Sequence, residues 1–156
     1  MYKKILVPLD GSELAECVLP HVESIAQGCG AQSVTFLRSV EPFHKLTSWD
    51  GGTVLSEADI SRIESGNKAD AKKYLENLVK RTKYEGVTAK YEVLMGTAAE
   101  SITDYAIKNK VDLIVIATHG RSGVSRWVWG SVADRILRSA CVPVLMVRAP
   151  GCVPGI

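Results

Sequence analysis

The sequence predicts an α/β fold: a single domain in which a parallel β-sheet lies between two layers of helices. Patterns typical of strands and helices alternate along the whole chain. Two apolar runs rich in β-branched residues, Leu113–Ala117 and Val144–Val147, have the composition of strands buried on both faces. A glycine-containing loop and an amphipathic segment, Ser131–Ala140, separate these runs. This order indicates a strand–helix–strand unit with a right-handed crossover.

Five strands are expected in all. The third lies nearer an edge of the sheet, because its apolar residues alternate with polar ones for part of its length. The five are Lys4–Leu9, Ser33–Val40, Val87–Met95, Leu113–Ala117 and Val144–Val147.

Helices are expected between these strands, and capping residues mark several of their ends. Ser12 is a suitable N-cap for the first helix, and Pro20 should kink that helix. Thr97 and Glu100 have the spacing of a capping box. The expected helices run from Glu13 to about Gln27, from Glu57 to about Lys83, and over Ala98–Asn109 and Ser131–Ala140.

The composition is that of an ordinary globular protein. The 156 residues are 46% hydrophobic and 23% charged, and the net charge is +2. The charge is too small, and basic runs too short, for a nucleic-acid-binding protein. No apolar stretch approaches the roughly 18 residues of a membrane span, and the N-terminus lacks the apolar region of a signal peptide. We therefore expect a cytoplasmic protein. Its four cysteines form no CxxC pair, so no metal site is expected.

The loop after the fourth strand is the candidate binding site. It contains Gly120, Gly123 and Gly130, and it runs from the carboxyl end of a strand into a helix N-terminus. Such loops present backbone N–H groups to phosphates. The spacing matches neither a Walker A loop nor GxGxxG. A structural interpretation stays open, because Ser131 and Asp134 also have the spacing of a capping box.

Four segments resemble the universal stress protein family. Gly120 and Gly130-Ser131 have the spacing of the signature G-x2-G-x9-G-[ST]. The family's first strand and turn are similar to KILVPLDGS at residues 4–12, and later junctions resemble Gly96–Ile102 and Cys141–Val147. The resemblance implies a Rossmann-like sheet of order 3-2-1-4-5 and one domain over residues 1–148. Residues 149–156 contain two prolines and two glycines and are expected to form a flexible tail.

The resemblance also implies a site for ATP, AMP or ADP, with Mg2+ beside the phosphates. Ala117 stands where the signature has its first glycine, which adds one methyl group of crowding. An alternative for Asp10 is that it only shapes the turn before Gly11. The adenosine side is expected to be lined by Pro8, Leu9, Asp10 and Val40, and the phosphate side by Ala117, Gly120, Arg121, Gly123, Gly130, Ser131 and Val132.

The expected function is that of a stress-response or signalling protein that binds ATP and hydrolyses it slowly at most. No catalytic residue is assigned, because no water-activating base stands out beside the phosphates. A phosphoacceptor receiver and a serine hydrolase are rejected, because Asp10 stands without an acidic cluster and GRSG lacks the nucleophile spacing. The alternative is a nucleotide-free family member that acts only through protein contacts.

The last expected strand favours dimer formation, because its apolar edge would be open. If Val142–Val147 lies at the sheet edge, its open apolar edge is covered by antiparallel pairing with a second copy, and the family resemblance implies the same homodimer. Trp127 and Trp129 belong either to that interface or to the core. The long loop over residues 41–56 is a candidate lid over the adenosine.

Overall fold

The computed structural model describes residues 1–42, 56–118 and 131–148. Within these ranges the elements follow the expected order and most end slightly inside the expected bounds. The strands are β1 (Lys4–Pro8), β2 (Ser33–Val40), β3 (Thr88–Met95), β4 (Leu113–Ala117) and β5 (Val144–Val147). The helices are a 3-10 turn η1 (Ala15–Val18), α1 (Leu19–Gly28), α2 (Glu57–Arg81), α3 (Ala98–Lys108) and α4 (Ser131–Ser139).

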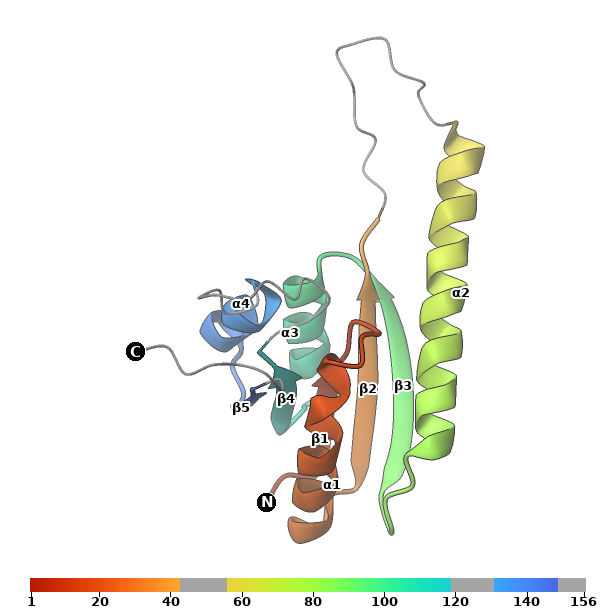
Figure 1. Ribbon diagram of the computed structural model, residues 1–156. Helices are drawn as coiled ribbons and strands as arrows, with labels where there is room; N and C mark the ends of the chain where they lie inside the picture. The colour runs from red at the N-terminus through yellow and green to blue at the C-terminus, as the bar shows by residue number, and fades with distance from the viewer. Residues whose placement is uncertain (43–55, 119–130, 149–156) are drawn as a thin grey trace.

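The five strands form one parallel sheet in the order β3-β2-β1-β4-β5, which confirms the predicted fold (Figure 1). The chain starts at the central strand, builds outward to β3, and returns to β4 on the other side of β1. The carboxyl ends of β1 and β4 therefore lie side by side at the point where the direction of winding reverses. Open α/β sheets bind ligands at this point.

Helices cover both faces of the sheet, so β1 and β4 are buried on both sides. Ile5 and Val7 pack with α1 and α2 in one core cluster, whereas Leu6 packs with α3 and α4 in the other. Alternate residues of a strand point to opposite faces, and this explains why both strands are continuous apolar runs.

The first helical segment differs from the expectation of one kinked helix starting at Glu13. A 3-10 turn, Ala15–Val18, comes first, and α1 begins only at Leu19. Pro20 therefore occupies the first turn of α1, where its missing N–H costs no hydrogen bond. Ser12 still contributes, since its hydroxyl accepts a 3.2 Å hydrogen bond from the Ala15 N–H.

Helix α2 is longer than the sheet it covers. Its buried residues, Ala71, Leu75 and Leu78, all lie in its second half. The first half contains none, and in Figure 1 it projects past the ends of β2 and β3. Ser56 caps this free end by accepting a 3.1 Å hydrogen bond from the Asp59 N–H.

The capping box predicted for Thr97 and Glu100 is wrong. Thr97 does occupy the N-cap position of α3, but its side chain makes no capping hydrogen bond. The entry to this helix is a tight turn at Gly96, whose φ of +144° disfavours any residue with a side chain. The Ser101 side chain also packs against this turn: a methyl group added at Gly96 would lie only 2.8 Å from its hydroxyl oxygen.

Candidate functional site

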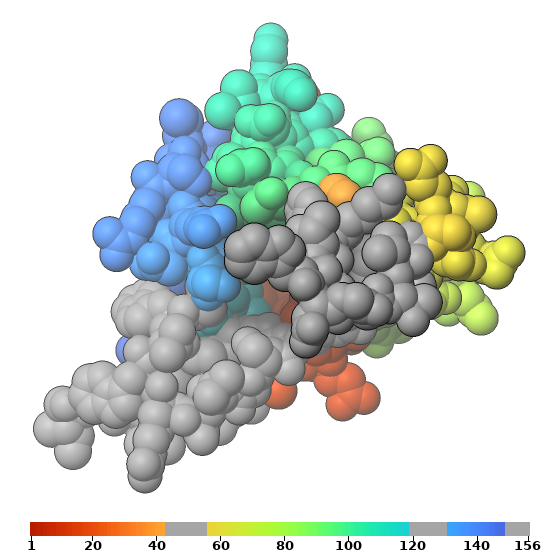
Figure 2. Space-filling model, turned by 90° about the horizontal axis from the view of Figure 1, so that it is seen from above, coloured from red at the N-terminus to blue at the C-terminus, as the bar shows by residue number. Residues whose placement is uncertain are grey.

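A cavity of about 600 Å3 lies at the carboxyl ends of the strands. Residues from the ends of β1, β2 and β4 and from the first turns of α3 and α4 line it. Figure 2 looks onto this end of the molecule, where α3 (turquoise) and α4 (blue) lie next to each other. The cavity therefore sits at the winding reversal between β1 and β4, the place expected for the site.

The turn after β1 contributes Pro8, Leu9 and Asp10 to the lining. The Asp10 carboxylate is held in place by Ser12, whose backbone N–H and hydroxyl donate to Oδ1 at 2.9 and 2.6 Å. This arrangement is an Asx turn, so the structural role considered for Asp10 is real. It also fixes the direction of a carboxylate at the edge of the cavity.

Gly11 is required at this turn by its backbone. Its φ is +86°, a conformation that residues with side chains rarely adopt. A methyl group there would also lie 2.7 Å from Nη1 of Arg38. The Arg38 guanidinium therefore lies directly against the turn that carries Asp10.

The end of β2 supplies several lining residues that the sequence interpretation missed. Arg38, Ser39 and Glu41 line the cavity. The Ser39 hydroxyl donates a 2.8 Å hydrogen bond to the Gly96 carbonyl, which joins β2 to the turn before α3. Their signal was available: β2 neighbours β1 in the implied sheet order, so its last residues must lie beside the turn at Asp10.

Val40 was expected near the base, but its side chain is not part of the cavity lining. It is buried in the core at 8% exposure, and its carbonyl accepts from the Gly96 N–H at 3.0 Å. Ser39 and Glu41, its two neighbours, reach the cavity instead.

Arg38 is supported from outside the cavity by a small polar network. Its guanidinium carbon lies 5.8 Å from the centre of the Tyr74 ring, within range of a cation–π contact. The Tyr74 hydroxyl donates to Oε1 of Glu16 at 2.8 Å, and Arg81 donates to the same oxygen at 2.6 Å. Burial, followed by the Glu16 contact, raises the pKa of Tyr74 well above its usual value. Tyr74 therefore stays neutral and remains a donor to Glu16.

The other side of the cavity is made by β4 and α4. Ala117 is 7% exposed, and its methyl group lines the cavity where the family signature has a glycine. Ser131 and Val132, in the first turn of α4, also line it. The first N–H groups of a helix have no partner within the helix and carry partial positive charge, so this side can accept an anion.

The predicted site residues divide into three groups. Six of them line one cavity: Pro8, Leu9, Asp10, Ala117, Ser131 and Val132. Val40 lies beside the cavity without lining it. Gly120, Arg121, Gly123 and Gly130 lie outside the described residues, as do Trp127, Trp129, residues 43–55 and the tail over residues 149–156.

Neither a metal cluster nor a membrane span stands out in the described parts of the chain. No group of three or more potential ligand side chains occurs there. None of the helices within residues 1–42, 56–118 and 131–148 is long and apolar enough to cross a bilayer. Of the four cysteines, Cys17 and Cys29 are partly buried and Cys141 is exposed, each as a free thiol, and Cys152 lies beyond the described ranges.

A parallel sheet wound in both directions from β1 defines a doubly wound α/β protein. Its mixed polar and apolar cavity lies at the winding reversal, where proteins of this class bind their ligands. The particular family follows from the sequence. The model of the universal stress protein family matches residues 1–148, and this chain belongs to that family.

Relatives of known sequence or structure agree over nearly the full length. The universal stress protein MJ0531 of Methanocaldococcus jannaschii is 34% identical over 151 residues, which are 96% of this chain and 84% of that protein. The solved structure of MJ0577, from the same organism, has a TM-score of 0.77 at 28% identity and covers 97% of this chain and 99% of that one.

A second solved structure of the family contains a bound nucleotide. It is the universal stress protein from Archaeoglobus fulgidus in complex with dAMP, with a TM-score of 0.58 at 25% identity. The match covers 93% of this chain and 97% of that chain.

Proposed function

We propose that this protein binds an adenine nucleotide, ATP with Mg2+ or its products ADP and AMP, in the cavity at the carboxyl ends of β1 and β4. The observation that carries the proposal is the convergence of three features on about 600 Å3 of space. They are the oriented Asp10 carboxylate, the end of β2 with Arg38, and the N-terminus of α4. A family member bound to dAMP supports the same ligand class.

Different residues would bind the two ends of the nucleotide, the adenosine and the phosphates. Asp10 would accept from ribose hydroxyls, since a carboxylate is an acceptor for two neighbouring O–H groups. Ser131 and the first N–H groups of α4 would bind phosphate, together with Gly120, Arg121, Gly123 and Gly130. Pro8, Leu9 and Ile102 supply apolar surface for the base.

This function is regulatory in nature: binding with slow hydrolysis at most, in a stress-response or signalling role. Residues 1–148 would form one domain that carries the site, followed by a flexible tail over residues 149–156. The acidic side chains at the cavity, Asp10 and Glu41, lie at the ends of β1 and β2. The proposed phosphate site is the N-terminus of α4, and we assign neither carboxylate the role of a catalytic base.

The proposal is tested by thermal unfolding with and without Mg-ATP. Ligand at about 100 times its Kd stabilises a protein by roughly 2.7 kcal/mol. We expect this stabilisation in the native chain and its loss in Gly130→Val, whose side chain would crowd the phosphates. No shift at millimolar ATP, together with no nucleotide released from freshly purified protein, would instead favour a nucleotide-free member that acts through protein contacts.

A homodimer through β5 is the second part of the proposal. β5 ends the sheet, so one side of this strand has no neighbour among the described strands. Leu145 is 36% exposed there, and open strand edges are commonly covered by another chain. Antiparallel pairing of two β5 strands about a two-fold axis would extend the sheet across both copies.

A further inference from the structure

Arg38 approaches both the candidate site and helix α2. It lines the cavity at the strand ends, and its Nη1 would lie 2.7 Å from a methyl group at Gly11, in the turn that carries Asp10. Its guanidinium carbon is 5.8 Å from the centre of the Tyr74 ring, within range of a cation–π contact. Two neighbours, one on the turn and one on α2, therefore define the position of this cation.

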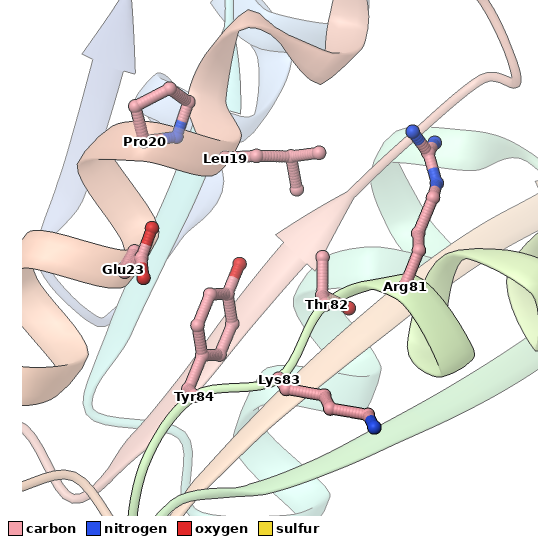
Figure 3. Close-up of a pocket in the computed structure, with 7 residues that line it drawn as sticks. All are labelled: Leu19, Pro20, Glu23, Arg81, Thr82, Lys83 and Tyr84. Atoms are coloured by element: carbon pink, nitrogen blue, oxygen red, sulfur yellow. The ribbon is translucent and has the colours of Figure 1, made fainter.

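The Tyr74 ring is itself held by an ion pair that joins η1 to the end of α2. Its hydroxyl donates to Oε1 of Glu16 at 2.8 Å, and Arg81 donates to the same oxygen at 2.6 Å. Only 18% of the Glu16 side chain is exposed, so this shared carboxylate is largely withdrawn from water. Arg81 also lines a second cavity, of about 230 Å3, and Figure 3 shows its side chain extending there away from Tyr84 and Lys83.

The negative charge of Asp10 acts as far as Tyr74. Burial and then the Glu16 contact raise the pKa of Tyr74, and the charge of Asp10 adds a smaller increase. Arg38 approaches both Tyr74 and the turn that carries Asp10, so its positive charge acts on the same carboxylate.

A nucleotide bound as proposed would make this cation important. Its ribose would cover the Asp10 carboxylate, and its phosphates would add more negative charge. A carboxylate that loses its water is unfavourable unless hydrogen bonds or a nearby cation compensate. A guanidinium stays charged in proteins, so Arg38 supplies such a cation. Because it packs against Gly11, it also limits movement of the turn and keeps the carboxylate in one direction.

We infer that Arg38 is a positioning residue of the nucleotide site and determines its preference for ribose over deoxyribose nucleotides. The inference rests on the proposed nucleotide function, in which Asp10 accepts from the ribose hydroxyls. Arg38 acts through Asp10, and the Tyr74 ring acts through Arg38. A deoxyribose lacks one of the two neighbouring hydroxyls and loses a hydrogen bond to the carboxylate. A carboxylate that has moved away would no longer distinguish the two sugars.

Titration calorimetry of the full chain with ATP and with dATP, each with Mg2+, tests this inference. The native chain should bind ATP about tenfold more tightly than dATP, as for one hydrogen bond to a charged group. Arg38→Met keeps an apolar stem and removes the charge, so ATP affinity should fall by about tenfold, dATP affinity should fall less, and the preference should largely disappear. Arg62→Met is the matched control, because the Arg62 side chain is 82% exposed in the first half of α2, and it should leave the preference unchanged.

Variants of Tyr74 test its part from outside the cavity. Tyr74→Leu removes the ring that contacts Arg38, so the preference for ATP should decrease. Tyr74→Phe keeps the ring and removes only the hydroxyl, so the preference should be retained. Tyr91→Leu is the matched control: Tyr91 also donates to a glutamate of α2, Glu76, at 2.8 Å, and it does not line the cavity. The unfolding midpoint without nucleotide shows whether each variant keeps its fold.

The possible results separate this inference from the proposed function. Equal affinity of the native chain for ATP and dATP, or an unchanged preference in Arg38→Met, would overturn the inference and leave the nucleotide site in place. A lower unfolding midpoint in Tyr74→Leu with an unchanged preference would overturn the role of Tyr74, which would then be structural only. Binding of neither nucleotide by the native chain would overturn the proposed function as well.

Discussion

Nη1 of Arg38 lies 2.7 Å from the position that a methyl group on Gly11 would take. This approach brings the end of β2 against the turn after β1, and it places a cation beside the turn that carries Asp10, at the edge of the candidate site. The positive φ of Gly11 and the proximity of Arg38 together explain why the turn is built from Asp10, Gly11 and Ser12.

Gly11→Ala should destabilise the protein by about 1–3 kcal/mol, because a side chain is strained at this φ whatever the space around it. Urea unfolding measures the change. Gly66→Ala is the matched control: this glycine lies inside α2 with nothing within 4 Å of the added methyl group. Its substitution should stabilise the helix by up to about 1 kcal/mol. Equal effects of the two substitutions would show that backbone conformation does not decide the outcome.

Asp10→Asn should weaken adenine nucleotide binding by about 10- to 100-fold, the value of roughly 1.5–3 kcal/mol for a hydrogen bond to a charged group. Asparagine keeps an oxygen that can accept from Ser12, so the turn should survive. Titration calorimetry measures the affinity, and the unfolding midpoint without nucleotide serves as the control. A lower midpoint with unchanged affinity would mean that Asp10 acts only in the turn.

Ala117→Gly should strengthen nucleotide binding if the extra methyl group crowds the phosphates. The same substitution should lower stability by about 1 kcal/mol, because glycine in a buried strand loses packing and gains chain entropy in the unfolded state. Binding and unfolding are therefore expected to change in opposite directions, which calorimetry and urea titration can separate. A loss of affinity in this variant would show that the methyl group is part of the binding surface.

Tyr84→Phe should be neutral or stabilising at neutral pH, because it removes a buried hydroxyl that has no partner among the described residues. The pH dependence gives a second signature. The folded pKa of about 12 exceeds the ordinary value of 10.0, so the folded state holds this proton more tightly than the unfolded state. The native chain should therefore lose stability, relative to the variant, as pH rises from 10.0 toward 12.

Thermal unfolding of both proteins in steps from about pH 8 to about pH 11, a range that includes the ordinary tyrosine pKa of about 10, measures this difference directly. Subtracting the variant removes the contribution of the other tyrosines, including Tyr74. Parallel curves over the whole range would contradict the assigned shift.

Leu145→Lys should convert a dimer into monomers, because a charged side chain on the edge strand opposes strand pairing between chains. Light scattering at micromolar concentration measures the mass. Ile107→Lys is the control, since Ile107 is 57% exposed but lies on α3, away from β5. A native chain that is already monomeric at this concentration would remove the basis for the proposed interface.

The sequence alone determined the layered α/β fold, because strands buried on both faces appear in it as uninterrupted apolar runs such as Leu113–Ala117. Family motifs extended that prediction to the strand order and to six residues of the cavity. Local capping rules were less successful. Pro20 begins a helix where a kink was expected, and the Thr97 side chain makes no cap, because the turn at Gly96 fixes the start of α3.

Only the tertiary structure decided which side chains face the cavities. Arg38 and Ser39 become part of the site because β2 pairs with β1, whereas the Val40 side chain stays buried in the core. The unpaired Tyr84 hydroxyl is likewise visible only after α1 and the end of α2 are brought together. Hydrophobic periodicity is a pattern of neighbouring residues, so the sequence shows it directly. Contacts between distant segments depend on how the whole chain packs.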